Sequence, residues 1–356
     1  MPSAAASFAI VGIGEDWLYA FGVPAGRGRI RAKAEDFIVR EDLGFEASGE
    51  GQHLLVHVRK RDSNTQYVAR ELARLAEVSP REVGYAGLKD RHAIAEQWFT
   101  IGLPSSKTQL DLGTGAQGFE ILSVEPHHRK LRRGALARNR FELRVTDLEG
   151  DRDELEERLT TIRDRGVPNY FGYQRFGRDG SNLVAARHLL IDGGHIKRRE
   201  ERSFAYSAAR SFLFNELLSF RIGTGVWDQL VVGDLANLDG VGSIFPVEAI
   251  DDTLRSRIAE LDIHPSGPLW GEGEPGTSGD PNAWELEHCG SHPFGVPLAE
   301  HGLSQMRRAL RLRVQDLEWS FEPEALRLSF ALNSGAFATS VLREVARTED
   351  SGTRDI

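Results

Sequence analysis

Strand-like segments of this sequence follow one another directly instead of alternating regularly with helices. Apolar residues alternate with polar ones at Phe37 and Val39 and again at Leu54, Val56 and Val58, the period that buries one face of a sheet. Further strands are predicted at residues 97–101, 119–124, 139–145 and 326–332. Parallel strands need long crossover connections, usually helices. The observed order therefore predicts an α/β (α+β) protein with a mixed, largely antiparallel sheet.

Helix signals stand between and after these strands. Ser63, with Gln66 three residues later, forms a capping-box pattern, and Val68, Leu72 and Leu75 then recur at helical spacing. Further helices are predicted at residues 155–165, 182–190, 203–220 and 337–345.

Two parts of the chain lack a regular pattern. Residues 223–302 are rich in Gly, Pro and Asp, and residues 271–281 within them are expected to form a long exposed loop. An insertion between two halves of one domain would explain this irregular middle. The polar tail, residues 347–356, is expected to have no regular structure.

Length and composition bound the class of protein. A chain of 356 residues with an ordinary apolar fraction has room for two domains. Its single cysteine, Cys289, forms no internal disulfide and fits a reducing compartment. No apolar run approaches the ~20 residues of a membrane-spanning helix, and residues 1–14 lack the basic start of an export signal. We therefore expect a cytoplasmic protein.

The net charge of −9 argues at first against binding to nucleic acid, which needs clustered Lys and Arg. The basic residues are nevertheless clustered, at 127–140, 197–199 and 307–313, while acidic residues gather elsewhere. This distribution predicts a polarised surface. The sequence leaves open the alternative that these clusters are solvated helix faces.

Most ready-made catalytic patterns are absent from the sequence. It has no Walker A loop and no G-x-S-x-G elbow, and Gly12-Ile13-Gly14 lacks the third glycine of a dinucleotide fingerprint. His288, Cys289 and His292 are capable metal ligands, but no second cysteine pair accompanies them. We expect a structural or solvent-exposed role for these three residues and no metal site.

One segment, residues 84–93, is dense in chemical groups. Its glycines, Gly84 and Gly87, allow a tight turn that delivers Asp90 between two cations, Lys89 and Arg91. A cationic neighbour would keep Asp90 ionised, as a nucleophile or base must be. The alternative is a surface turn in which Asp90 simply pairs with Lys89 or Arg91.

Five segments, in order along the chain, carry a family resemblance. They are EDFIVRE at 35–41, GYAGLKDRHA at 84–93 with Glu96-Gln97-Trp98, GALARNRF at 134–141, VPNYFGYQRFG at 167–177 and GAFATSVLRE at 335–344. Together they resemble the motifs of the TruD family of tRNA pseudouridine synthases. The resemblance implies a pseudouridine synthase catalytic domain made of residues 28–164 and 314–345. It also implies a family-specific α/β insertion domain at 165–313 and terminal extensions at 1–27 and 346–356.

The resemblance also implies roles for single residues. Asp90 matches the catalytic aspartate of the family. The matched substrate-binding residues are Phe37, Asn139 and Phe337, which line the uridine pocket, Phe141, which stacks where other pseudouridine synthases have a tyrosine, and Lys89 and Arg31. Some relatives have a lysine at the position of Arg31, and a lysine would keep the charge but change the hydrogen-bond geometry. Each phenylalanine taken alone is more often a core residue.

The implied reaction converts a uridine, expected to be uridine 13 in the D-arm of a tRNA, to pseudouridine. The glycosidic bond breaks, the base rotates and a new bond forms at C5, while the aromatic side chains hold the extruded base. Asp90 would attack C1′ or remove the C2′ proton, and the sequence leaves both routes open. No cofactor is expected, because an isomerisation involves no redox change.

tRNA is the expected partner. The candidates for contacts to its phosphates are the basic residues Arg129, Lys130, Arg132, Arg133, Arg307 and Arg308. The aromatic residues of 169–177 would either stack on RNA or pack between two domains. Two other functions compete with the synthase: an RNA-binding protein with an inert pocket, and a nucleoside hydrolase that releases uracil.

Overall fold

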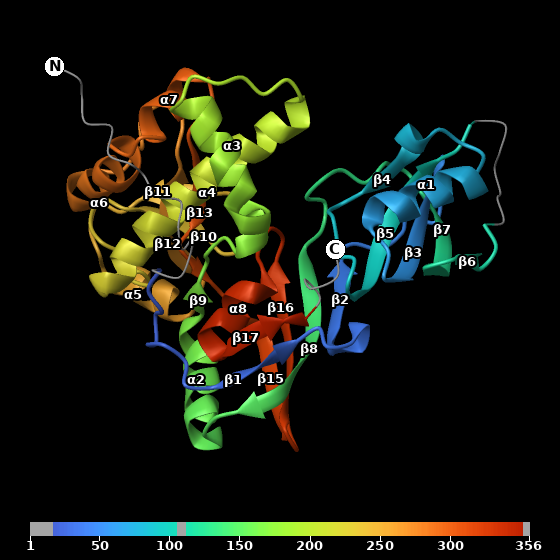
Figure 1. Ribbon diagram of the computed structural model, residues 1–356, viewed down its shortest axis with the longest axis horizontal. Helices are drawn as coiled ribbons and strands as arrows, with labels where there is room; N and C mark the ends of the chain where they lie inside the picture. The colour runs from blue at the N-terminus through green and yellow to red at the C-terminus, as the bar shows by residue number, and fades with distance from the viewer. Residues whose placement is uncertain (1–16, 105–111, 352–356) are drawn as a thin grey trace. The chain divides into compact units, whose positions relative to one another are not determined.

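The structure of the protein is a computed structural model that describes residues 17–104 and 112–351 (Figure 1). The chain divides into two compact units. The first, here the sheet unit, comprises Pro24–Leu159, Val314–Ala338 and Val345–Ile356. The second, here the helical unit, comprises Met1–Val23, Thr160–Arg313 and Thr339–Glu344. The assignment of residues 165–313 to an insertion domain stays a prediction.

An eleven-stranded sheet forms the sheet unit, with eight strands in the order β15-β16-β8-β2-β5-β3-β7-β6. β1 pairs with β8 and β17, and β4 pairs with β5. Among the described pairs, β1–β17 and β2–β5 are parallel and the others antiparallel, so the prediction of a mixed, largely antiparallel sheet is confirmed. The strands are β1 (Arg27–Ile30), β2 (Phe37–Asp42), β3 (His53–Arg61), β4 (Val83–Tyr85), β5 (Ile94–Gly102), β6 (Gly115–Ala116), β7 (Phe119–His127), β8 (Arg138–Glu149), β15 (Gln315–Glu322), β16 (Ala325–Asn333) and β17 (Arg347–Asp350).

Helix α1 (Thr65–Leu75) covers the part of the sheet formed by β3 and β5. Its Val68 and Leu72 are fully buried in one cluster with Phe99 of β5, as the helical spacing predicted. The predicted cap is wrong by one residue. Asn64, not Ser63, is the N-cap, and its side chain accepts a hydrogen bond from the backbone N–H of Tyr67 at 2.7 Å.

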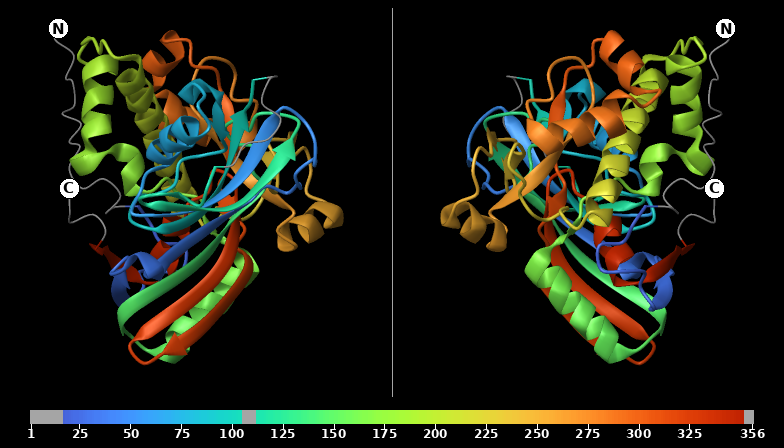
Figure 2. Two further views of the ribbon diagram at one scale, coloured as in Figure 1. Left: turned by 90° about the vertical axis from the view of Figure 1, so that its right-hand side faces the viewer. Right: turned by 90° about the vertical axis from the view of Figure 1, so that its left-hand side faces the viewer.

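Helix α2 (Arg152–Arg165), whose first half belongs to the sheet unit, runs beside β15 and β16 (Figures 1 and 2). Its Leu155 and Leu159 are buried. Arg152 at its start donates to the backbone oxygen of Glu322 in β15 at 3.2 Å. Helix α8 (Ala338–Val345) follows β16 in sequence, and its residues Thr339–Glu344 belong to the helical unit.

The tail is more ordered than its composition predicted. Residues 347–350 form β17, which pairs in parallel with β1 from Arg27↔Arg347 to Ile30↔Asp350. The expectation of no regular structure is therefore wrong for these four residues. Polar side chains do not prevent an edge strand, because the backbone supplies the pairing groups.

The helical unit contains regular structure where the sequence pattern showed none. A four-stranded sheet has the order β11-β10-β12-β13. Its strands are short, and the longest, β12 (IHPSGPL), contains Pro and Gly, so the alternation that marks a strand is absent or too brief to be recognised. The α-helices and strands that lie wholly within residues 160–313 are β9 (Val167–Pro168), α3 (Ser181–Leu190), α4 (Arg199–Gly223), β10 (Leu235–Leu238), β11 (Ile244–Pro246), α5 (Asp252–Ala259), β12 (Ile263–Leu269), α6 (Gly279–Glu285), α7 (Gly295–Glu300), β13 (Met306–Ala309) and β14 (Arg311–Leu312).

The predicted loop at 271–281 is only partly exposed, because Gly271, Pro275 and Pro281 are buried and α6 begins at Gly279. Within the described part of the chain, no helix has the length and apolar character needed to cross a membrane.

Candidate active site

The loop that carries Asp90 runs between β4 and β5 and is tied to both α1 and β5. Gln97 of β5 donates to the backbone oxygen of Gly87 at 2.8 Å. Thr65, at the start of α1, donates to Gln97 Oε1 at 2.9 Å and accepts from the backbone N–H of Lys89 at 3.0 Å. Buried side chains therefore fix the backbone just before Asp90.

A buried lysine holds the backbone of Asp90 itself. Lys60, at the end of β3, is fully buried, and its Nζ donates to the backbone oxygens of Ser63 and Asp90, each at 2.6 Å. Burial lowers the pKa of Lys60 to about 8, and the negative charge of Asp90 acts against this shift. The sequence did carry a signal for this residue, because Lys60 continues the inward alternation of Val56 and Val58.

The carboxylate of Asp90 pairs with Arg31, a residue far from it in sequence. Arg31 Nη2 lies 3.0 Å from Asp90 Oδ2, and the arginine side chain is 5% exposed, against 38% for the aspartate. Lys89 instead contacts Glu41, and Arg91 donates to the backbone oxygen of Asp62 at 3.3 Å. The alternative in which Asp90 pairs with its own neighbours is therefore wrong.

Glu41 is a buried carboxylate whose role in the site was not predicted from sequence. Besides Lys89, it accepts from the backbone N–H of Trp98 at 2.9 Å and from Gln97 Nε2 at 3.3 Å. Its place at an inward position of β2, in phase with Phe37 and Val39, was the available signal. The contact from Glu41 to Lys89 links the loop of Asp90 to the sheet.

Aromatic rings lie on the same sheet face. Phe37 and Phe141 meet edge to face with 6.2 Å between ring centroids, and Phe141 stacks on Phe330 at 5.4 Å. Arg31 Cζ lies 4.3 Å from the centroid of Phe37. The site residue Phe337 is half-buried on the segment between β16 and α8. Phe330 was predicted only as a strand residue.

Buried polar atoms of Arg31, of the loop that carries Asp90 and of β8 have no hydrogen-bond partner among the described residues. They are Arg31 Nε, His92 Nε2 and Asn139 Oδ1. Asn139 stands opposite Glu41 in the pairing of β8 with β2. Because buried polar groups are almost always satisfied, such atoms are suited to a polar ligand.

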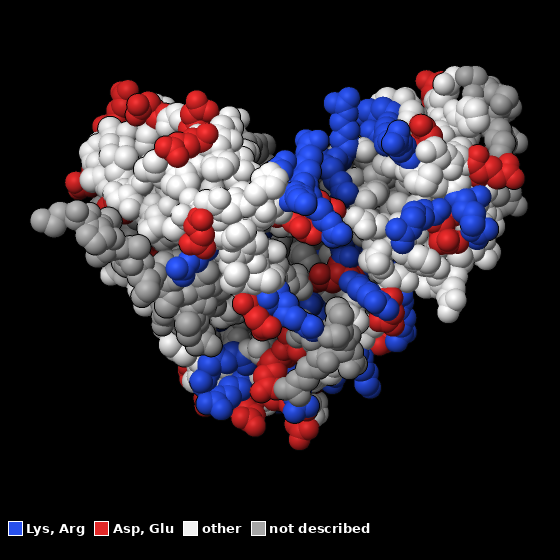
Figure 3. Space-filling model, turned by 45° about the horizontal axis from the view of Figure 1, so that its top comes forward, with Lys and Arg blue, Asp and Glu red and all other residues white. Residues whose placement is uncertain are grey.

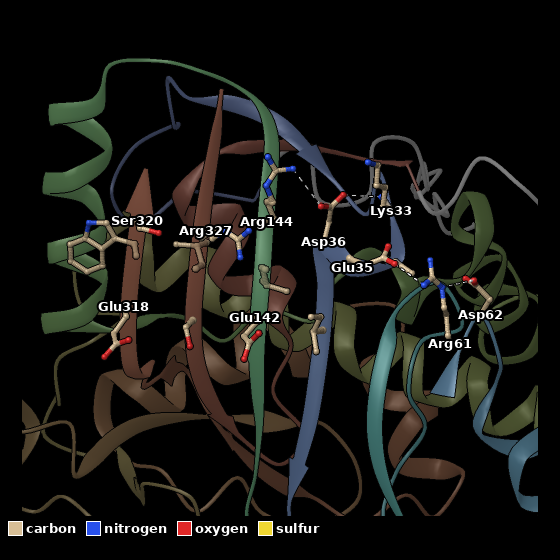
Figure 4. Close-up of a pocket in the computed structure, with 16 residues that line it drawn as sticks. Lys33, Glu35, Asp36, Arg61, Asp62, Glu142, Arg144, Glu318, Ser320 and Arg327 are labelled. Carbon is tan, nitrogen blue, oxygen red and sulfur yellow. Dashed lines mark hydrogen bonds and ion pairs between the residues drawn. The ribbon is translucent and has the colours of Figure 1, made fainter. Parts of the chain in front are cut away.

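A pocket of about 1170 Å³ opens on the other face of the sheet (Figure 4). Ile38 lines it, and since Ile38 alternates with Phe37, this face is opposite the aromatic rings. None of the site residues predicted from sequence lines this pocket. Some of its charged groups pair with one another, as Arg61 does with Glu35 at 2.7 Å.

The predicted phosphate-binding residues differ in their surroundings. Figure 3 shows Lys and Arg gathered over the part of the sheet unit around β4. The exposed basic residues of the segment between β7 and β8 are Arg129, Lys130, Arg132 and Arg133. Arg133 also donates to the hydroxyl of Tyr85 at 2.9 Å.

The other two candidates make internal contacts. Arg307 forms a buried ion pair with Glu285 at 2.8 Å. Arg308 lies over the ring of Phe171 at 4.2 Å and donates to Asn169, and burial lowers its pKa to about 9. These contacts occupy both guanidinium groups within the helical unit.

The aromatic segment 169–177 is mostly packed inside the helical unit. Tyr170, Phe171 and Phe176 are buried, whereas Tyr173 is 62% exposed. Among the aromatic residues of this segment, Tyr173 has the most exposed side chain.

Cys289 is buried in the helical unit, where its thiol donates to the backbone oxygen of Leu213 at 3.6 Å. No cluster of three or more His, Cys, Asp or Glu side chains suited to a metal occurs within 17–104 and 112–351.

Comparisons with known proteins agree on one family. Residues 15–193 and 199–345 match the family model of tRNA pseudouridine synthase D (TruD). A tRNA pseudouridine synthase D of Methylococcus capsulatus is 45% identical over 345 residues, which cover 96% of this chain and 97% of that protein. Another, of Aeromonas hydrophila, is 46% identical over 339 residues, covering 95% and 96%.

A solved structure supports the fold. The crystal structure of a protein of Methanosarcina mazei described as a putative tRNA pseudouridine synthase D (TruD) matches with a TM-score of 0.66 and 22% identity. The match covers 92% of this chain and 95% of that chain. The matches place the protein in the class of pseudouridine synthases, which are isomerases. Within that class, the chain belongs to the tRNA pseudouridine synthase D (TruD) family.

Proposed function

We propose that this protein isomerises uridine 13 in the D-arm of tRNA to pseudouridine, with Asp90 as its catalytic residue, in the cytoplasm and without a cofactor. Relatives with 45% and 46% identity over nearly the whole chain are named tRNA pseudouridine synthase D. The observation that carries the proposal is the ion pair at 3.0 Å between Asp90 and the buried Arg31, beside the ring of Phe37.

Asp90 is suited to either route for breaking the glycosidic bond. As a nucleophile, its oxygen forms a bond to C1′ while the electron pair of the C1′–N1 bond leaves with the uracil. As a base, it takes the C2′ proton while the same bond breaks, which leaves a glycal. In both routes the detached base rotates and its C5 bonds to C1′. This step breaks the Asp90–C1′ bond in the first route and returns the proton from Asp90 to C2′ in the second. The C5 proton is then removed and N1 is protonated, so that Asp90 ends as the free carboxylate.

The surrounding residues supply what a detached uracil needs. The half-buried Phe337 offers ring surface on which an extruded base stacks. Phe37 and Phe141, only 4% and 7% exposed, form the apolar floor of the site. Asn139 Oδ1, buried with no partner among the described residues, accepts a hydrogen bond from a polar edge of the base. Lys89 holds the loop through Glu41.

The decisive experiment compares the wild type with Asp90→Asn on unmodified tRNA transcripts. Pseudouridine is mapped by carbodiimide-dependent stops of reverse transcription, and tRNA binding is measured separately. We expect a stop at uridine 13 that is lost in the variant, with tRNA affinity within about threefold, because the substitution preserves shape. Asp147→Asn, in an exposed ion pair with Arg29 at 3.4 Å, is the matched control and should keep full activity.

Two outcomes would favour the competing functions. A wild-type protein that binds tRNA and leaves no pseudouridine would support an RNA-binding protein with an inert pocket. Free uracil in the reaction mixture, with no pseudouridine in the RNA, would support a hydrolase. Either result would overturn the proposed isomerisation.

A further inference from the structure

The C-terminal strand β17 brings a second carboxylate to the arginine that pairs with Asp90. β17 runs parallel to β1, and the register places Asp350 opposite Ile30, the residue before Arg31. Arg31 Nη1 lies 3.0 Å from Asp350 Oδ2, while Nη2 lies 3.0 Å from Asp90 Oδ2. One guanidinium therefore serves two carboxylates that come from distant parts of the chain.

The geometry of Arg31 makes these two contacts dependent on each other. A guanidinium is a planar group with its donors in a fixed arrangement, so a rotation that breaks one contact displaces the other. The side chain is buried, with its Cζ 4.3 Å from the centroid of Phe37. The backbone is also unusual here, since the φ of Arg31 is 56°, in the left-handed region. The position of the Arg31 guanidinium therefore depends on its contacts with Phe37, Asp90 and Asp350.

We infer that Asp350 is a positioning residue that acts on Asp90 through Arg31, an inference that rests on the proposed function. Asp90 loses its negative charge in both routes, either by bonding to C1′ or by taking the C2′ proton. A buried guanidinium left without a counterion is unfavourable. Asp350 remains as that counterion, so Arg31 keeps its place until Asp90 is ionised again.

Asp350 also affects Asp90 before the reaction begins, when Asp90 is a free carboxylate. With Asp350 present, Arg31 divides its donors between two carboxylates, so that Asp90 receives one hydrogen bond from it instead of a bidentate pair. A bidentate pair would bind the carboxylate more tightly and make it a poorer nucleophile or base. The residues that match the family model end at 345, and the site predicted from sequence contained no residue of the tail.

The test is a kinetic comparison of Asp350→Asn with the wild type, measuring kcat and KM for an unmodified tRNA transcript. We expect kcat to fall about 10- to 100-fold, the size typical of a lost hydrogen bond to a charged group. KM should stay within about twofold, because Asp350 acts on the reacting carboxylate and not on RNA affinity. Asp350→Glu, which keeps the charge, should recover at least half of the lost activity on a logarithmic scale.

A double-mutant cycle tests whether Asp350 affects kcat through Arg31. In an Arg31→Gln background, Asp350→Asn should change kcat by less than about twofold, because its partner is already gone. Glu349→Gln removes the same charge from an exposed neighbour on β17 and should leave kcat unchanged. An unchanged kcat in Asp350→Asn, or an equal loss with and without Arg31, would overturn the inference. Pseudouridine formation by the wild type in the same assay shows separately whether the proposed function holds.

Discussion

The ammonium group of Lys60 occupies an inward position of β3 where an apolar side chain would be expected. It donates to two backbone oxygens, at Ser63 and Asp90, and contributes to the charge environment of the site. Among the described residues, no carboxylate forms an ion pair with this buried ammonium. Burying it is unfavourable for folding, so its contribution to the free energy of unfolding depends on pH.

At the residue scale we therefore predict that wild-type stability rises with pH relative to Lys60→Met. Below pH 8, Lys60 is protonated in the folded and in the unfolded chain. Between about 8 and the unfolded value of 10.5, the unfolded chain binds more protons at this site, so the free energy of unfolding increases. Urea unfolding at pH 7.5 and pH 10 should show a relative gain on the order of 2 kcal/mol.

The control for this prediction is Lys197→Met, which removes an exposed lysine and should change stability by less than about 0.5 kcal/mol at pH 7.5. If the free energies of unfolding of the wild type and Lys60→Met differed by the same amount at both pH values, Lys60 would not be neutralised within the folded protein.

At the scale of elements, we predict the effect of the N-cap of α1 on stability, because α1 supplies Thr65 to the loop of Asp90. Asn64→Ala removes the side-chain acceptor for the N–H of Tyr67 and should lower the free energy of unfolding by about 1 kcal/mol. Ser63→Ala, at the cap that the sequence predicted, should change it by less than half as much. Urea unfolding of both variants measures the difference, and the reverse ranking would contradict the cap seen in the structure.

At the scale of the whole molecule, a chain with a net charge of −9 needs a local basic surface to bind RNA. The exposed residues Arg132 and Arg133 supply part of it, so Arg132→Gln with Arg133→Gln should weaken tRNA binding and flatten its dependence on salt. Each lost phosphate contact lowers the slope of log K against log salt by about 0.7 to 0.9.

Filter binding of tRNA between 50 and 200 mM salt, as approximate limits, measures this slope. Arg74→Gln, an exposed arginine of α1 that pairs with Glu71 at 3.0 Å, is the control and should leave the slope unchanged. An unchanged slope in the double variant would remove the segment between β7 and β8 from the RNA-binding surface.

Local pattern was enough to determine much of this protein. The alternation around Phe37 and Val39 predicted β2, the spacing of Val68 and Leu72 predicted α1, and the segment at 84–93 drew attention to Asp90. These features depend on residues a few positions apart, which is the range over which strand and helix periods act. The family segments added the expected roles of Phe141, Asn139 and the other site residues.

Only the tertiary structure determined which charged side chains form ion pairs. Arg31 lies 59 positions from Asp90 and 319 from Asp350, and Lys89 turns to Glu41 instead of to its neighbour. Such pairs depend on strand order, direction and register, in particular on the parallel pairing of β17 with β1. A single sequence does not encode these as a local period, because they arise from backbone pairing and burial across the whole sheet.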